Sequence, residues 1–149
     1  MLDDTDRRIL RHYQADPDSP ATELAERAGV TASTLARRLE RLRETGVLKG
    51  VRGVIDWHAL GYEVDLRVTL DKTQPRAFDT FIAAAREVPE VLEIQTFLGQ
   101  VDVRLAVIAR DMPHYQRIYR ERLLDLPHIQ DIEALMHVAR LKDEETLPL

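Results

Sequence analysis

The chain has 149 residues, of which 44% are hydrophobic and 32% charged, a composition typical of a globular protein with one domain or two small ones. It contains no cysteine, which excludes disulfides and thiolate metal sites and suits a reducing cytoplasm. No apolar run approaches the roughly 20 residues that a membrane span needs, and the acidic start MLDDTDRR is unlike a signal peptide. We therefore expect a soluble, cytoplasmic protein without a membrane partner.

The net charge of −5 hides a local basic patch. Residues 27–52 hold seven basic side chains against only Glu40 and Glu44. The net acidity argues against a non-specific polyanion binder, whereas a patch of this kind suits a local contact with a polyanion.

Three helices are predicted in the first 46 residues. The first follows the acidic residues at positions 3, 4 and 6, which suit the positive end of a helix. The second, ATELAERAG, ends at Gly29, and the third begins at the good N-cap Thr31 and ends at Gly46. The valine-rich VLKGVRGVI that follows predicts a short extended pair, or wing.

The third helix, TASTLARRLERLRETG, has two distinct faces. Leu35, Leu39 and Leu42 form one apolar stripe at helical spacing. Hydroxyls and arginines gather on the opposite side. Such a face usually belongs to an ordinary amphipathic helix, but the preceding short helix and the turn at Gly29 and Val30 give helix-turn-helix spacing.

In that motif the second helix enters the major groove of DNA, and flanking basic residues hold phosphates. We expect Ser33, Thr34, Arg37 and Arg38 to read or brace the groove. Arg41, Lys49 and Arg52 are expected to hold phosphate. The predicted DNA-binding residues are Thr31, Ser33, Thr34, Arg37, Arg38, Arg41, Lys49 and Arg52.

From Tyr62 the hydrophobic period changes to two, and the elements follow the order β-α-β-β-α-β. A helix capped by Thr73 with Pro75 in its first turn follows the first strand, and Gly99 with Gln100 predicts a tight two-residue turn between the second and third strands. This order is the ferredoxin-like arrangement, with both helices on one face of an antiparallel sheet. The other face would carry Glu63, Arg67, Arg104 and Glu133, and we expect a second subunit to cover it.

The predicted fold class is therefore α+β. A winged helix-turn-helix domain occupies residues 1–55 and a connector residues 56–61. A C-terminal βαββαβ ferredoxin-like domain spans residues 62–142, and the tail at 143–149 is expected to be loosely ordered.

Four stretches occur in a fixed order along the chain: LDDTDRRIL, ELAERAGVTASTLARRLERLRETGVLKG, HALGY and the closing LPL. In this combination they resemble the leucine-responsive regulator/AsnC (Lrp/AsnC) family of bacterial and archaeal transcription regulators. It implies a winged helix-turn-helix, a βαββαβ (RAM-type) sensing domain, dimers that often assemble into octamers, and a small-molecule effector, most often an amino acid.

The resemblance also implies an effector site at the hairpin after the second strand of the sensing domain. Where the family typically has Gly-Asp-Tyr-Asp, this chain has Gly99, Gln100, Val101 and Asp102. Ile132 and Ala134 replace the hydroxyl residues usual on the last strand, which favours a more apolar ligand or none. Asp102 is a candidate acceptor for a ligand ammonium group, or else a solvent-exposed carboxylate, and Gly99 is expected to be needed for the turn.

Catalysis finds little support in the sequence. The five histidines show no metal-ligand spacing, and no phosphate-binding glycine loop or nucleophile elbow is present, so we expect no metal, no cofactor and no enzyme activity. One alternative is a sirohaem decarboxylase, which looks like the same architecture and would use His58 with Arg52. A third possibility is an assembly scaffold whose arginines only solvate a helix.

Overall fold

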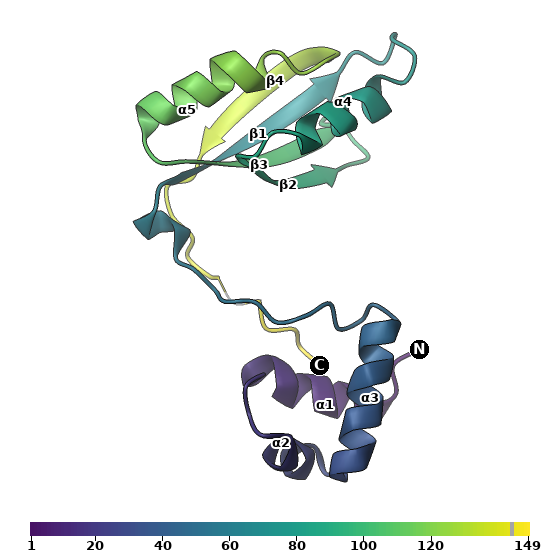
Figure 1. Ribbon diagram of the computed structural model, residues 1–149. Helices are drawn as coiled ribbons and strands as arrows, with labels where there is room; N and C mark the ends of the chain where they lie inside the picture. Colours follow the sequence, from purple (N-terminus) through teal and green to yellow (C-terminus); the bar gives the residue numbers. More distant parts are fainter. Residues whose placement is uncertain (144) are drawn as a thin grey trace. The chain divides into compact units, whose positions relative to one another are not determined.

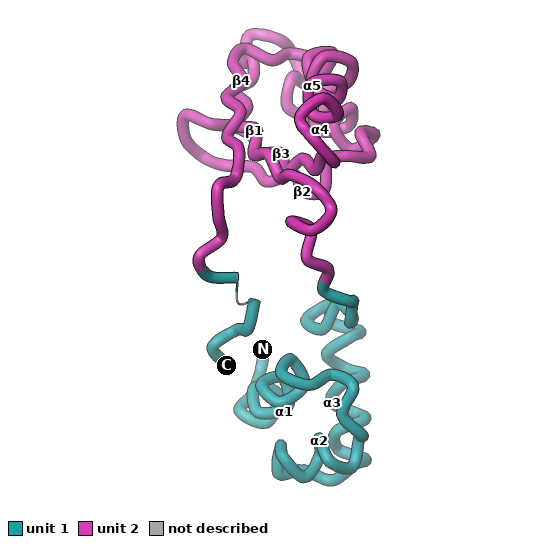
Figure 2. The backbone as a smooth tube through the Cα atoms, turned by 90° about the vertical axis from the view of Figure 1, so that its left-hand side faces the viewer, with its two compact units in different colours: residues 1–54, 142–149 teal, residues 55–141 magenta. Residues whose placement is uncertain are grey.

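The computed structural model describes residues 1–143 and 145–149 (Figure 1), and the chain forms two compact units. Residues 1–54 and 142–149 form the first, which we call the helical unit, and residues 55–141 form the second, the sheet unit (Figure 2). Among the described residues, no helix has the length and apolar character needed to cross a membrane.

The helical unit contains α1 (Asp4–Ala15), α2 (Ala21–Ala28) and α3 (Ala32–Glu44). The predicted stripe of α3 is confirmed, because Leu35, Leu39 and Leu42 are all buried. Leu35 and Leu39 pack in one cluster with Ile9 of α1 and the apolar residues of α2. The apolar spacing of three short helices thus produces a single small core.

Local signals at the helix ends act as predicted. Gly29 ends α2 in the left-handed conformation, with φ of 66°. Thr31 begins α3, and its hydroxyl accepts a hydrogen bond from the backbone N–H of Thr34 at 3.2 Å. Asp3 and Asp6 form a reciprocal capping box at the start of α1.

The extended pair predicted in VLKGVRGVI does not form. Residues 47–56 contain no strand, and Val51 and Val54 are exposed. An isolated two-stranded ribbon is marginal in water, and these valines find no apolar surface to pack on. The segment after α3 is therefore irregular in the single chain.

The sheet unit has the predicted βαββαβ order in an antiparallel sheet whose strands are arranged β2-β3-β1-β4. Both helices cover one face of this sheet (Figure 1). A short 3-10 turn, Trp57–Ala59, precedes it, and a π-helical turn, Tyr119–Leu123, extends α5. Its elements are β1 (Tyr62–Leu70), α4 (Ala77–Arg86), β2 (Val91–Thr96), β3 (Val103–Ala109), α5 (Met112–Ile118) and β4 (Ile129–Met136).

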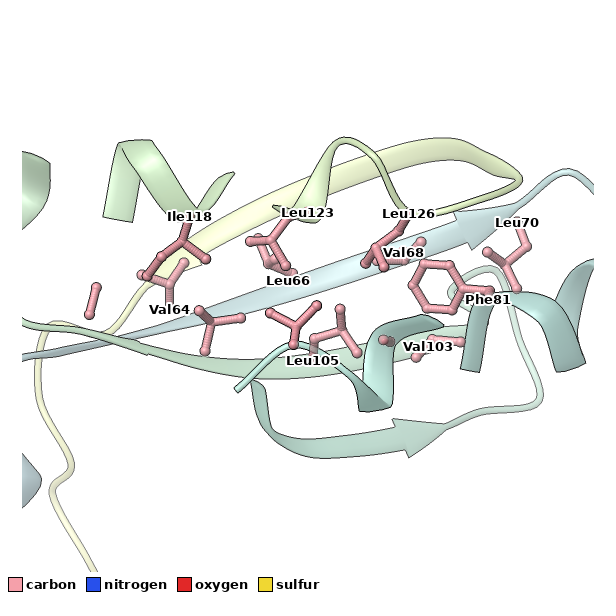
Figure 3. Packing of buried hydrophobic residues seen from close by; sticks show 14 residues of the cluster. Val64, Leu66, Val68, Leu70, Phe81, Val103, Leu105, Ile118, Leu123 and Leu126 are labelled. Atoms are coloured by element: carbon pink, nitrogen blue, oxygen red, sulfur yellow. The ribbon is translucent and has the colours of Figure 1, made fainter. Parts of the chain in front are cut away.

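The core lies between the sheet and its helices. Alternate residues of the central strand β1, such as Leu66 and Val68, point to this side and are fully buried. Figure 3 shows them packed with Phe81 of α4 and with Ile118 and Leu123 from the second helical segment. The intervening β1 residues consequently fall on the other, uncovered face.

Two turn predictions in this unit are wrong. The pairing of β2 and β3 extends to Phe97 and Asp102, whose backbones bond at 3.0 Å, so residues 98–101 form the loop instead of a two-residue turn. Gly99 does not adopt a left-handed conformation, and a Cβ there would meet open space. Because the longer loop spreads the reversal over more residues, the turn does not require glycine.

The start of α4 also differs from the prediction. The helix begins at Ala77 without a side-chain cap, and Arg76 before it has φ of 56°. Thr73 instead donates its hydroxyl hydrogen to Asp71 at 2.6 Å, closing a turn after β1. Thr73 lies three residues before the N-cap position Arg76, so its hydroxyl oxygen is not placed to accept the first N–H groups of α4.

Gly61 is required where β1 begins. A Cβ at this position would lie 2.1 Å from the backbone oxygen of Ala109, which belongs to the neighbouring strand β3. We expect Gly61→Ala to destabilise the sheet unit by about 1–3 kcal/mol, since the two backbones must separate. Gly99→Ala is the matched control because its site is open. Thermal unfolding compares the two; equal melting temperatures would contradict the proposed close approach.

Asp3 makes the helical unit sensitive to acid. The backbone N–H of Asp6 and, next, the guanidinium of Arg38 lower the pKa of Asp3 to about 2 from its ordinary 3.8. Because the folded-state pKa is the lower one, this stabilisation is complete above about pH 4 and disappears as the pH falls towards 2.

We therefore expect Asp3→Asn to lower the melting temperature of the helical unit at pH 7, and the difference from wild type to shrink between pH 4 and pH 2. Circular dichroism at 222 nm follows the transition. Asp4→Asn, in the same helical turn, is the control. A difference that stays constant down to pH 2 would show that the Asp3 charge does not contribute.

Candidate nucleic-acid interface and effector site

The start of α3 presents a group of hydroxyls. Thr31 Oγ1 lies 3.2 Å from Ser33 Oγ and donates to Thr34 Oγ1 at 3.0 Å. Thr31 and Ser33 are exposed and Thr34 is half-buried. They stand at the positive end of a 13-residue helix, a place that favours contact with anions such as phosphate.

Arg38 and Arg41 of the same helix are directed to α1. Arg38 donates to Asp3 and, at 3.1 Å, to Asp6, while Arg41 donates to the second oxygen of Asp6 at 2.5 Å. Asp6 is 0% exposed, although it carries a charge. A buried carboxylate is tolerated when cations and donors surround it, so these ion pairs fix α3 against α1.

Arg37 lies between these residues in sequence but differs in its contacts. It is exposed, and it makes no hydrogen bond or ion pair within the described residues. By comparison, Arg43 lies 3.6 Å from Glu40 of its own helix. Arg37 is thus the α3 guanidinium that remains available to an external partner.

Lys49 and Arg52 follow α3 in the irregular segment, and both are exposed. The Arg52 guanidinium lies 3.8 Å from a carboxylate oxygen of Glu145. Sequence reasoning placed Arg38 among the groove contacts and Arg41 among the phosphate contacts, because a helical wheel considers one helix alone. It treated Asp3 and Asp6 only as caps and therefore missed their partnership with α3.

In the sheet unit, Asp102 is neither a free acceptor nor a solvent-exposed carboxylate. Its side chain is only 12% exposed; one oxygen accepts the backbone N–H of Leu70 at 2.8 Å, and the other lies 2.9 Å from Lys72 Nζ. The Leu70 N–H chiefly, and the Lys72 ammonium after it, lower the pKa of Asp102 against the effect of burial. Asp102 therefore joins the start of β3 to the end of β1.

The other predicted effector residues lie around the same end of the sheet. Gly99 and Gln100 are exposed at the hairpin, with Val101 half-buried beside them. The Gln100 carbonyl accepts the Thr69 hydroxyl at 3.2 Å. On β4, Ile132 pairs with Val68 and Ala134 with Leu66, which places both on the helix-covered face, away from the Asp65 side.

A hollow at this end of the sheet was not predicted. It has a volume of about 550 Å³ and is open to solvent. Its polar groups are the Lys72 ammonium, the Asp71 carboxylate, the Gln130 amide and the hydroxyls of two threonines. The lining residues are Thr69, Leu70, Asp71, Lys72, Thr73 and Gln130. The sequence DKT after β1 was the available signal, but it resembles any polar turn.

The uncovered face of the sheet carries a network of ion pairs. Asp65 accepts from Arg104 at 2.6 Å and lies 3.2 Å from His137 Nε2, while nearly buried Glu63 accepts from Arg140. Burial alone would raise the pKa of Asp65, but the hydrogen bonds from Arg104 and His137 hold it below its ordinary value. Glu63, Asp65 and His137 are close enough to chelate a metal ion, yet two guanidiniums already neutralise the carboxylates.

The decarboxylase alternative gains no support here. His58 stacks on Trp57 with ring centroids 3.7 Å apart and lies 3.4 Å from the Asp56 carboxylate. Both contacts are local packing around the 3-10 turn. They show no role toward a tetrapyrrole.

Comparison with known proteins assigns both units. The family described as winged helix-turn-helix DNA-binding matches residues 2–49, and the Lrp/AsnC ligand binding domain matches residues 63–147. A proline dehydrogenase transcriptional activator from Rhodobacter capsulatus is 36% identical over 131 residues, covering 87% of this chain and 85% of the relative. A leucine-responsive regulatory protein from Salmonella typhimurium is 29% identical, covering 98% of this chain and 90% of the relative.

A solved structure agrees with these sequences. A transcriptional regulator from Neisseria meningitidis, crystallised as a complex with L-Met, superposes with a TM-score of 0.89 at 28% identity, covering 99% of this chain and 97% of its own. The shared organisation spans the helix-turn-helix and the βαββαβ sheet alike. The chain belongs to the Lrp/AsnC family of transcriptional regulators.

Proposed function

We propose that α3 is the recognition helix and that Arg37 is its principal base-reading side chain. The observation that carries the assignment is the contrast on one helix: Arg37 is exposed and unpaired within the described residues, whereas Arg38 and Arg41 are bound to Asp6. A guanidinium that first has to break a buried ion pair is a costly DNA ligand. Arg37 carries no such cost.

The other residues predicted to contact DNA fall into three roles according to their side-chain chemistry. Ser33 and Thr34 brace the major groove near Arg37, and Thr31 caps the helix that carries them. Lys49 and Arg52 hold phosphates, where a point charge or an exposed guanidinium suffices. Arg38 and Arg41 orient α3 and strengthen the local positive field without reading bases.

The assembly proposed for this function is a homodimer formed through the uncovered sheet face. Two copies present two recognition helices to successive half-sites, and further association of dimers gives an octamer. The protein acts on double-stranded DNA in the cytoplasm as a regulator without enzyme activity.

The effector proposed here is an amino acid or a related carboxylate, bound between the 99–102 hairpin and the hollow beside it. Lys72 is exposed and supplies a cation for the ligand carboxylate. The hydroxyls of Thr69 and Thr73 already donate to Gln100 and Asp71, so their oxygens are left to accept from a ligand ammonium. Asp102 holds Lys72 at 2.9 Å and so positions the ammonium. The L-Met complex of the Neisseria regulator supports this ligand class.

The assignment of α3 predicts different behaviour for two cations. We expect Arg37→Ala to reduce the discrimination between cognate and unrelated DNA by about 1–3 kcal/mol, because the guanidinium no longer reads a base. Lys49→Ala should weaken binding to both DNAs alike and reduce the slope of log K against log salt by about one unit for each phosphate that is no longer neutralised. Fluorescence anisotropy at several salt concentrations measures both effects.

Arg43→Ala provides the matched control, since Arg43 is exposed on the same helix and paired with Glu40. It should bind cognate DNA nearly as wild type does. If Arg37→Ala retains full sequence preference while Arg43→Ala loses it, the orientation of α3 proposed here is wrong.

The effector proposal predicts an asymmetry between Lys72 and Asp102. Lys72→Met should weaken amino-acid binding at least tenfold, because the ligand carboxylate loses its cation. Asp102→Asn should have a smaller effect, since an amide oxygen still accepts the Leu70 N–H. Isothermal titration calorimetry with a panel including L-Met and L-Leu compares the variants. The opposite ranking would instead assign Asp102 to the ligand ammonium.

A further inference from the structure

The tail of the chain is bound to α1 inside the helical unit. Gln14 Nε2 donates to the backbone oxygen of Leu147 at 2.8 Å, and the backbone N–H of Leu147 donates back to Gln14 Oε1 at 2.9 Å. Arg11 Nε donates to the backbone oxygen of Leu149 at 2.7 Å. We call residues 145–149 the tail segment; Figure 2 colours it with the helical unit.

The Gln14 contact has the geometry of peptide recognition. One primary amide satisfies both the donor and the acceptor of the same residue, as a neighbouring β-strand would. Such a two-point contact fixes the register of an extended segment and does not depend on its side chain. The expectation of a loosely ordered tail took no account of these polar groups on α1.

Docking the tail brings an acidic residue to a predicted DNA contact. Glu145 lies two positions before Leu147, and its carboxylate is 3.8 Å from the Arg52 guanidinium. Both side chains are highly exposed, 79% for Glu145 and 83% for Arg52, so the pair would be weak by itself. The two hydrogen bonds between Gln14 and Leu147 hold the tail in place and so raise the effective concentration of the Glu145 carboxylate near Arg52.

We propose that the tail segment is an intramolecular acidic ligand of the helical unit, held to α1 by Gln14 and Arg11, that competes with DNA phosphate for Arg52. This inference rests on the proposed function of Arg52 as a phosphate contact. The tail lowers DNA affinity when docked, and DNA binding at Arg52 displaces the Glu145 carboxylate.

Hydrogen exchange tests the docking, because the Leu147 N–H donates to Gln14 Oε1. In NMR-detected exchange of the full chain, this amide should exchange about tenfold faster in Gln14→Ala than in wild type. Arg8→Ala is the control, since Arg8 is exposed elsewhere on α1. Equal exchange rates in wild type and Gln14→Ala, or the same increase in both variants, would overturn the docking.

DNA titration at low salt tests the competition. Glu145→Gln should bind DNA about two- to fivefold more tightly than wild type, the range expected for the loss of one exposed ion pair. In an Arg52→Ala background the same substitution should give no gain. Asp125→Asn, an exposed acid of the sheet unit, measures the general effect of removing one negative charge.

An equal gain for Glu145→Gln and Asp125→Asn, or a gain that persists in the Arg52→Ala background, would overturn the competition. These failures differ from a failure of the proposed function, in which the wild-type chain would bind no DNA at all. The exchange result is independent of DNA and separates the two cases.

Discussion

The buried carboxylate of Asp6 is the constraint on which the DNA-binding surface depends. It belongs to α1, but its two oxygens are bonded to Arg38 and Arg41 of α3. A charge without water is stable only while such partners remain in place, so the orientation of α3 is tied to α1. The same bonds occupy two of the arginines that face away from the leucine stripe and leave Arg37 available. The Asp6 carboxylate thus fixes the orientation of α3, the proposed recognition helix, and leaves Arg37 as its exposed, unpaired guanidinium.

The two faces of the sheet differ because successive side chains of β1 point alternately to opposite sides. Residues such as Leu66 and Val68 fill the core beneath the helices, whereas Glu63 and Asp65 enter an ion-pair network on the other side. Burying charged side chains costs less free energy when they are ion-paired with one another than when they are isolated. A face of this kind suits a specific polar contact between subunits better than an indiscriminate apolar one.

At the end of the sheet, the hydrogen bonds of the Asp102 carboxylate decide which charge is offered at the proposed effector site. The Asp102 carboxylate accepts the Leu70 N–H and pairs with the Lys72 ammonium, so the proposed site offers a cation and not a free carboxylate. The family resemblance implied an effector site at this hairpin. Whether the region offers a positive or a negative group depends on the ion pair between Asp102, at the start of β3, and Lys72, in the turn after β1.

Periodicity and end signals in the sequence determined the order of the elements, the leucine stripe of α3, the ends at Gly29 and Thr31, and the core face of β1. These features are local, because they depend on residues a few positions apart. Only the tertiary structure decided the partners of Arg38, Arg41 and Asp102, the loop at 98–101 and the docking of Leu147 on Gln14. These features either join residues that are far apart in sequence or depend on a choice between competing hydrogen bonds. A local sequence pattern does not specify which partner a charged or polar side chain will have in the folded chain.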